Sequence, residues 1–187
     1  NYYVDYLMVD NVYISLNRVR TPKPESTSAT YTGLYLGGYQ AHATNIYATI
    51  TNCDLYDLKV GPRGNSASAT THPEVVIGPN VTINNGLYVA AHIAKVINPV
   101  IEIKENVTIN GGISDTLWSN GNQGITGYAT YKLADETYKD TFLNLGSPKV
   151  VIIGENKYGT AASYTALDEA LTAARAILDN EEEASKY

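Results

Sequence analysis

Tyrosine is the residue type in this chain with the clearest binding chemistry. The 187 residues include 16 Tyr but only one Phe and one Trp, so nearly every aromatic ring carries a hydroxyl. A tyrosine ring can stack on the apolar face of a sugar while its hydroxyl bonds the sugar's own hydroxyls. Tyr35, Tyr56 and Tyr88 each follow a leucine in a short apolar segment. If Leu34, Leu55 and Leu87 point inward, the three tyrosines form an outward ladder that can bind a glycan.

A second column of candidate residues lies near the longest predicted loop. Aligning the glycine-led segments that begin at residues 33, 86 and 112 brings together Tyr39, His92 and Trp118. These three residues and the ladder tyrosines are the predicted ligand-binding set. Exposed tyrosines are also ordinary strand formers, so a purely structural role for them stays open.

The chain offers no evident catalytic or metal-binding motif. His42, His72 and His92 lack metal-ligand spacing and have no evident nucleophile partner. Asp54 and Asp57 are close in sequence, but no neighbouring repeat clearly supplies further acids in register for a calcium ion. We therefore predict no catalytic residue, no metal and no cofactor. A fragment of a polysaccharide lyase or glycoside hydrolase is kept as an alternative.

Composition narrows the class of protein. The net charge is −6 and there is no basic run, which argues against nucleic-acid binding. No apolar run approaches the ~18 residues of a membrane span. A charged fraction of 17%, with Asn, Thr, Gly and Tyr in its place, favours an extracellular β protein. The single cysteine, Cys53, cannot form an internal disulfide and is predicted to be a small buried residue.

The elements that must position these residues form a repeat. The stretch Val81–Val89 recurs as Val107–Ile113, at a spacing of 26 (107 − 81), and each copy has two short strands around an Asn or Asn/Gly corner. A third strand precedes each copy, and a longer loop at 91–99 follows the first. Such strands are too short to bury a face alone, so stacked turns are expected to share one core. The predicted inward residues are Val75, Ile77, Val81, Ile83 and Leu87, with Ile101, Ile103, Val107, Ile109 and Ile113 stacked on them.

Two segments depart from the repeat. Residues 114–148 are predicted to form an enlarged loop insertion with a short helix near 133–145. Residues 161–187 are predicted to form an amphipathic helix, with Thr165 as its N-cap and Leu167 and Leu171 on its apolar face. The predicted organisation is one domain over 1–160, followed by a helix that caps it or begins another module. Because the chain starts in mid-strand without Met, we expect it to be a piece of a longer protein.

The three-stranded turn with asparagine corners, over roughly residues 4–160, resembles the right-handed parallel β-helix of the pectate-lyase-like superfamily. The resemblance implies an all-β solenoid with about 26 residues per turn. Domains of this kind include polysaccharide-active enzymes and also non-catalytic adhesive or sugar-binding modules. Residues 163–174 look like the first helix of the FIVAR modules attached to Gram-positive surface proteins.

Together these resemblances imply a non-catalytic carbohydrate-binding or adhesive module of a bacterial surface protein. Its location would be secreted or at the cell surface, and its partner a polysaccharide or host glycan, with no nucleic acid and no membrane insertion. A structural stalk or spacer is the second alternative.

Overall fold

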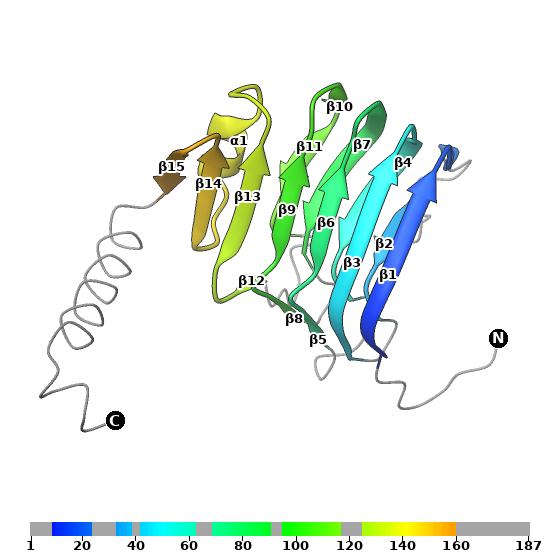
Figure 1. Ribbon diagram of the computed structural model, residues 1–187, viewed down its shortest axis with the longest axis horizontal. Helices are drawn as coiled ribbons and strands as arrows, with labels where there is room; N and C mark the ends of the chain where they lie inside the picture. The colour runs from blue at the N-terminus through cyan, green and yellow to red at the C-terminus, as the bar shows by residue number, and fades with distance from the viewer. Residues whose placement is uncertain are drawn as a thin grey trace, which may run out of the picture.

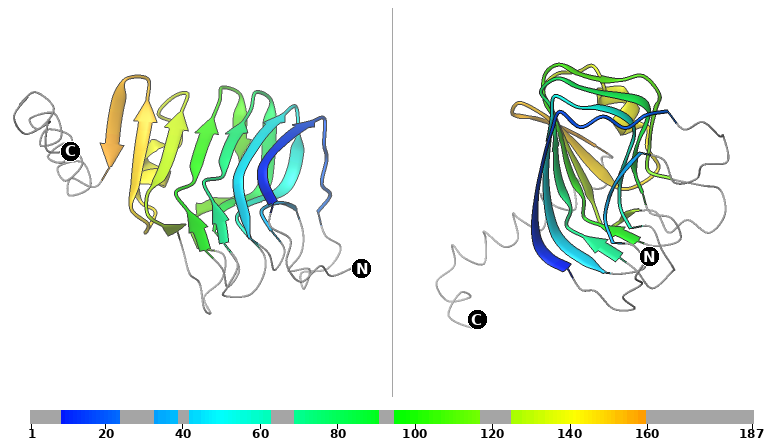
Figure 2. Two further views of the ribbon diagram at one scale, coloured as in Figure 1. Left: turned by 60° about the horizontal axis from the view of Figure 1, so that its bottom comes forward. Right: turned by 90° about the vertical axis from the view of Figure 1, so that its right-hand side faces the viewer.

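The chain folds into parallel β-strands that lie side by side along one axis. The computed structural model describes residues 9–23, 33–38, 42–62, 69–90, 95–116 and 125–159. This part is mostly β-strand with one short helix, and its parallel sheets curl into a half-barrel (Figures 1 and 2). The prediction of an all-β protein is therefore confirmed.

The larger sheet is organised around β3 (Ala43–Thr51). One edge of β3 pairs with β1 (Val9–Asn17), and the other edge pairs with β5 (Ala69–Thr71) and then with β6 (Glu74–Ile77). Beyond β5 follow β8 (Lys95–Ile97) and β12 (Ile125–Thr126). Beyond β6 follow β9 (Val100–Ile103), β13 (Ala129–Leu133) and β14 (Lys149–Ile153). These pairs are parallel, whereas the last strand, β15 (Asn156–Gly159), runs antiparallel to β14.

The smaller sheet faces the larger one across the core. Its order is β2 (Leu34–Leu36), β4 (Asp54–Val60) and β7 (Val81–Val89), and β7 then pairs with both β10 (Val107–Ile109) and β11 (Gly112–Ser114). Helix α1 (Lys139–Leu143) lies between β13 and β14 in sequence and buries Phe142 against the end of the core.

The predicted spacing of 26 residues is the pairing register of neighbouring strands. Val81 pairs with Val107, and Glu74 pairs with Val100 (100 − 74 = 26). The predicted inward residues from Val75 to Ile103 are buried. Val107, Ile109 and Ile113 are only partly buried, because in the described part no further strand of the smaller sheet follows β10 and β11.

Asparagine marks the corners because it tolerates left-handed backbone. One column of corner residues, with φ from 48° to 54°, consists of Asn11, Asn45, His72 and Asn98, and a second, with φ from 52° to 59°, consists of Arg18, Asn52, Asn80 and Asn106. Side-chain amides bond along the second column: Asn80 Nδ2 donates to Asn52 Oδ1 at 3.0 Å. Asn52 Nδ2 in turn donates at 3.0 Å to Oδ1 of Asn17, the residue before Arg18. His72 takes an asparagine position in the first column, which gives it a structural role.

Two predictions about loops are wrong in part. Residues 91–99, predicted as a long loop, include β8 and the turn into β9. Residues 114–148, predicted as a loop insertion, include β12, β13 and α1, and β13 continues the stack between β9 and β14. The repeat is hidden there because Tyr131 pairs with Ile101 at a spacing of 30 (131 − 101).

Other predictions are confirmed or lie outside the described residues. Helix α1 falls within the predicted range 133–145, and Cys53 is buried with its sulfur 3.3 Å from the backbone nitrogen of Val19. The predicted helix over 161–187 lies outside the described residues.

Candidate functional site

The outer face of the smaller sheet carries a row in which a lysine lies between two tyrosines. Tyr35 on β2 pairs with Lys59 on β4, and Lys59 pairs with Tyr88 on β7. The predicted ladder of Tyr35, Tyr56 and Tyr88 is therefore wrong in its middle member. The pairing of β4 with β7 shifts by one residue between Leu55 and Asp57, where Asn84 and Asn85 lie opposite Tyr56 alone. Beyond this bulge Lys59, not Tyr56, lies beside Tyr88.

Lys59 is unusually enclosed for a lysine on an outer face. Its ammonium lies 3.1 Å from Asp57 Oδ2, and the two side chains are only 6% and 5% exposed. The ammonium also lies 4.8 Å from the ring centre of Tyr35 and 5.9 Å from that of Tyr88. Both distances fit attraction between a cation and an aromatic face. The two half-buried rings thus contribute to an internal cluster.

Glycine in β7 makes room for this cluster. A side chain at Gly86 would meet the Tyr88 ring at 2.7 Å, so the ring lies against the sheet at this point. Burial raises the pKa of Tyr88, and the nearby Asp57 carboxylate raises it further. Asn85 Nδ2 donates to Asp57 Oδ1 at 2.8 Å. The carboxylate therefore holds a lysine on one oxygen and an amide on the other.

The remaining predicted ligand-binding residues do not join this row. Tyr56 is half-buried at the bulge, where its backbone N–H donates to Thr21 Oγ1 at 2.7 Å. Tyr39, His92 and Trp118 lie outside the described residues, so their predicted column stays a prediction.

Among the described residues, the most exposed aromatic side chain lies on the larger sheet instead. Tyr13 on β1 and Tyr47 on β3 are paired in register and stack with ring centres 4.9 Å apart and planes 15° apart. Tyr13 is 78% exposed. Glu74 follows Tyr47 in the same row, and the exposed hydroxyls of Ser15 and Thr49 stand two residues along each strand.

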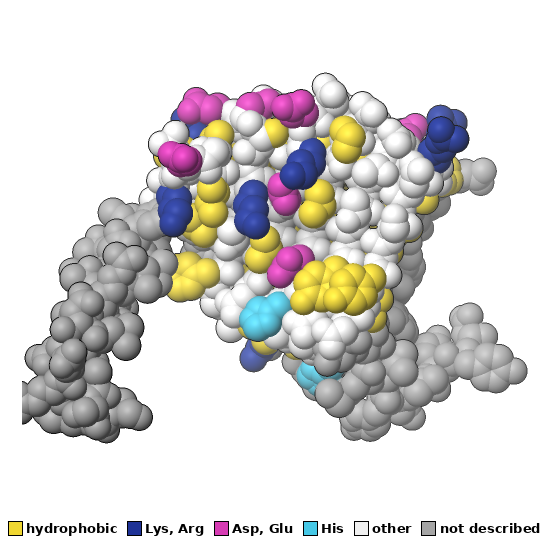
Figure 3. Space-filling view, viewed as in Figure 1, with side chains coloured by type: hydrophobic (Ala, Val, Ile, Leu, Met, Phe, Trp, Pro, Cys, Tyr) yellow, Lys and Arg dark blue, Asp and Glu magenta, His cyan; other side chains and the backbone are white. Residues whose placement is uncertain are grey.

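Figure 3 shows this face of the molecule. Hydrophobic side chains gather over β1 and β3, with acidic and histidine side chains beside them. An aromatic face, a carboxylate and two hydroxyls within one small area supply both the stacking surface and the polar groups that a sugar requires. We call Tyr13, Tyr47, Glu74, Ser15 and Thr49 the tyrosine platform.

The platform does not follow from the repeat seen in the sequence, because the spacing of its two tyrosines differs from that repeat. Tyr13 and Tyr47 are 34 residues apart (47 − 13), whereas Glu74 of β6 and Val100 of β9 are 26 apart. The sequence nevertheless contains a pattern that places the two tyrosines side by side. Each tyrosine stands two residues after a corner asparagine, in the phrases Asn11-Val12-Tyr13 and Asn45-Ile46-Tyr47. Aligning the corners would have brought the tyrosines together.

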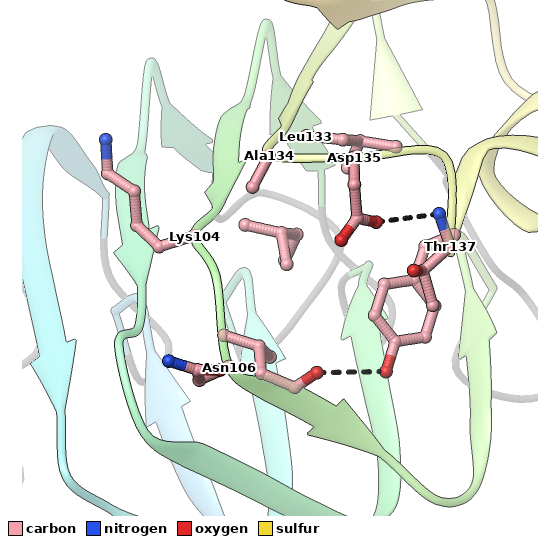
Figure 4. Close-up of a pocket in the computed structure, with 9 residues that line it drawn as sticks. Lys104, Asn106, Leu133, Ala134, Asp135 and Thr137 are labelled. Atoms are coloured by element: carbon pink, nitrogen blue, oxygen red, sulfur yellow. Dashed lines mark hydrogen bonds between the residues drawn. The ribbon is translucent and has the colours of Figure 1, made fainter.

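A small cavity near α1 is too small for a sugar. It has a volume of about 30 Å³ and is lined by residues from β9, β10 and the β13–α1 connection, including Lys104, Asp135 and Tyr138 (Figure 4). The Tyr138 hydroxyl donates to the Val107 carbonyl at 3.2 Å and accepts the Ile109 N–H at 2.9 Å. These bonds fasten the α1 segment to the last strand of the smaller sheet, so we assign the cavity a structural role.

Acidic and histidine side chains in the described ranges do not gather as metal ligands do. Among these residues no three or more His, Cys, Asp or Glu side chains lie close enough together to hold a metal ion. No helix in the same part of the chain combines the length and the apolar character needed to cross a membrane.

Comparison with known proteins gives no match. No family model, no curated protein and no solved structure matches this chain.

Proposed function

We propose that the chain is a non-catalytic carbohydrate-binding or adhesive module, part of a bacterial surface protein and secreted or exposed at the cell surface. It would bind a polysaccharide or host glycan. The observation that carries the proposal is the exposed Tyr13–Tyr47 stack, with Glu74 beside it in the same row. The tyrosine platform replaces the Tyr35–Tyr56–Tyr88 ladder as the proposed binding surface, since Tyr35 and Tyr88 pack around Lys59.

The fold proposed with this function is a right-handed parallel β-helix. Its support is the parallel pairing of strands from successive repeats in both sheets, with a recurrent spacing of 26 and asparagine at the corners. Such a stack presents flat, regular outer faces on which side chains from neighbouring turns lie about 4.8 Å apart. A flat face of this kind suits an extended sugar chain, because successive residues of the chain can contact successive strands.

The platform has the parts that sugar binding requires. The rings of Tyr13 and Tyr47 supply a stacking face, and Tyr13 is 78% exposed. The Glu74 carboxylate accepts hydrogen bonds from sugar hydroxyls, and the hydroxyls of Ser15 and Thr49 both donate and accept them. Individual contacts of this type are weak, so we expect modest affinity for each sugar unit and stronger attachment through repeated units.

A glycan array and a polysaccharide pull-down with the intact chain test the proposal. The wild type should retain a subset of glycans, and Tyr13→Ala should weaken that binding about fivefold, the equivalent of ~1 kcal/mol for one aromatic contact. The matched control is Tyr128→Ala, which removes a 49% exposed tyrosine outside the platform and should leave binding unchanged. Absence of glycan binding by the wild type would refute the proposal, and so would equal losses in both variants.

A further inference from the structure

A cluster on the smaller sheet brings together a lysine amine, a carboxylate and an asparagine amide, the three groups of an amide-exchange reaction. Asp57 Oδ2 lies 3.1 Å from the Lys59 ammonium, and Asp57 Oδ1 accepts the Asn85 amide N–H at 2.8 Å. Lys59 and Asp57 belong to β4, and Asn85 belongs to the neighbouring strand β7. The lysine amine and the asparagine amide are thus bound to the same side chain across a strand boundary.

The lysine and the aspartate are enclosed and in direct contact. Lys59 and Asp57 are only 6% and 5% exposed, and their ammonium and carboxylate lie 3.1 Å apart. Moving one proton from the ammonium to the carboxylate gives a neutral amine and a neutral carboxylic acid without moving a heavy atom. The rings of Tyr35 and Tyr88 hold the nitrogen in place, and they shield it from water.

We propose that Lys59 and Asn85 form an intramolecular isopeptide bond, with Asp57 as the proton-transfer residue. The Lys59 ammonium first gives a proton to Asp57. The neutral Nζ then attacks Asn85 Cγ, the Nζ–Cγ bond forms, and the C=O electrons move to the amide oxygen. Asp57 takes the second proton from Nζ and gives a proton to the Asn85 nitrogen. The Cγ–Nδ2 bond breaks and ammonia leaves, so an amine and a primary amide become a secondary amide and ammonia.

The position of Asn85 suits this reaction. Its residue is exposed at the corner of β7, so ammonia can leave to solvent while the amine and acid stay enclosed. No oxidant, metal or second protein is required. The product would join β4 to β7 covalently, and this inference does not depend on the proposed glycan binding.

The chain supplies a matched comparison in the adjacent residue. Asn84 Nδ2 also donates to a carboxylate, Asp54 Oδ1, at 2.7 Å. The cation beside Asp54 is the guanidinium of Arg20, with its Nε 3.4 Å from Oδ2. Since a guanidinium stays protonated, it cannot act as the nucleophile. Asn84 should therefore keep its amide.

Intact-mass measurement of the purified chain tests the proposal. The wild type and Asn84→Ala should each be lighter than their sequence mass by one ammonia, whereas Lys59→Arg, Asp57→Ala and Asn85→Ala should have their full sequence mass. Peptide mapping should recover one branched peptide that contains both Lys59 and Asn85. A wild type with its full sequence mass would overturn the proposal.

A second route to the same mass loss must be separated from this one. Asn85 precedes Gly86, and an Asn-Gly pair can lose ammonia by closing a succinimide ring on its own backbone. That ring would form without Lys59 and would be cleaved by hydroxylamine. A mass deficit that persists in Lys59→Arg, or that hydroxylamine removes, would therefore also overturn the isopeptide bond.

Discussion

Removal of the hydroxyl group of Tyr131 should stabilise the protein. Tyr131 lies on β13 with 0% exposure, and its hydroxyl has no hydrogen-bond partner in the part of the chain that the structure describes. Its ring packs on Phe142 with ring centres 4.3 Å apart, and a phenylalanine at position 131 would keep that contact. A buried polar group without a partner costs about 1–3 kcal/mol, and part of this gain is offset by the small space left behind. We expect Tyr131→Phe to gain about 1 kcal/mol.

That gain should raise the midpoint of thermal unfolding by about 2–4 °C for a chain of this size. The measurement is calorimetry together with urea unfolding, where the midpoint should rise at an unchanged slope. Tyr13→Phe is the matched control: it makes the same chemical change at a 78% exposed position, and its stability should change by less than about 0.5 kcal/mol. A loss of 1 kcal/mol or more in Tyr131→Phe would show that the hydroxyl has a favourable partner, and the reasoning would be refuted.

Three further predictions concern pH, glycine and the corner asparagines. Burial, and then the Asp115 carboxylate, raise the pKa of Tyr131 in the folded protein. Its contribution to stability is therefore complete below about pH 10 and falls as the pH rises further, because only the unfolded chain can then release the proton. Between about pH 9 and pH 11, Tyr131→Phe should lose less stability than the wild type in urea titrations. Gly111→Ala should lower the free energy of unfolding by more than about 1 kcal/mol, because its methyl group would overlap the Asn85 carbonyl. At Gly112 an added methyl group meets open space, so Gly112→Ala should lower it by less than about 0.5 kcal/mol. Equal midpoints of thermal unfolding for the two variants would contradict this. Asn52→Gly should lose about 1 kcal/mol of stability, because it removes the side-chain hydrogen bonds to Asn17 and Asn80. Asn52→Ala should lose about 1–2 kcal/mol more, because alanine also disfavours the φ of 52° at this position. The urea midpoint should therefore be lower for Asn52→Ala than for Asn52→Gly.

The sequence by itself determined which residues face the core in the regular turns. Strand side chains alternate with a fixed period of two, so the alternation alone assigns Val75, Ile77, Ile101 and Ile103 inward, and all four are buried. The corner asparagines were equally readable, because left-handed backbone selects asparagine and glycine locally. The spacing of 26 then gave the pairing of the central strands.

Only the tertiary structure decided which outward side chains are neighbours. That depends on the spacing in sequence between paired residues of neighbouring strands, which is 34 from Tyr13 to Tyr47 and 30 from Ile101 to Tyr131. It also depends on the bulge in the β4–β7 pairing, which places Lys59 beside Tyr88, and on the β2–β4 register, which places it beside Tyr35.

A longer connection changes no local propensity and leaves the alternation within each strand intact, so nothing in a single strand reveals it. The bulge does interrupt the alternation of β4, where the buried Leu55 and Leu58 are three residues apart, but this break does not identify the partner of each residue. The core rows follow from local chemistry. The tyrosine platform and the Asp57–Lys59–Asn85 cluster follow from register, which is fixed only when the turns pack together.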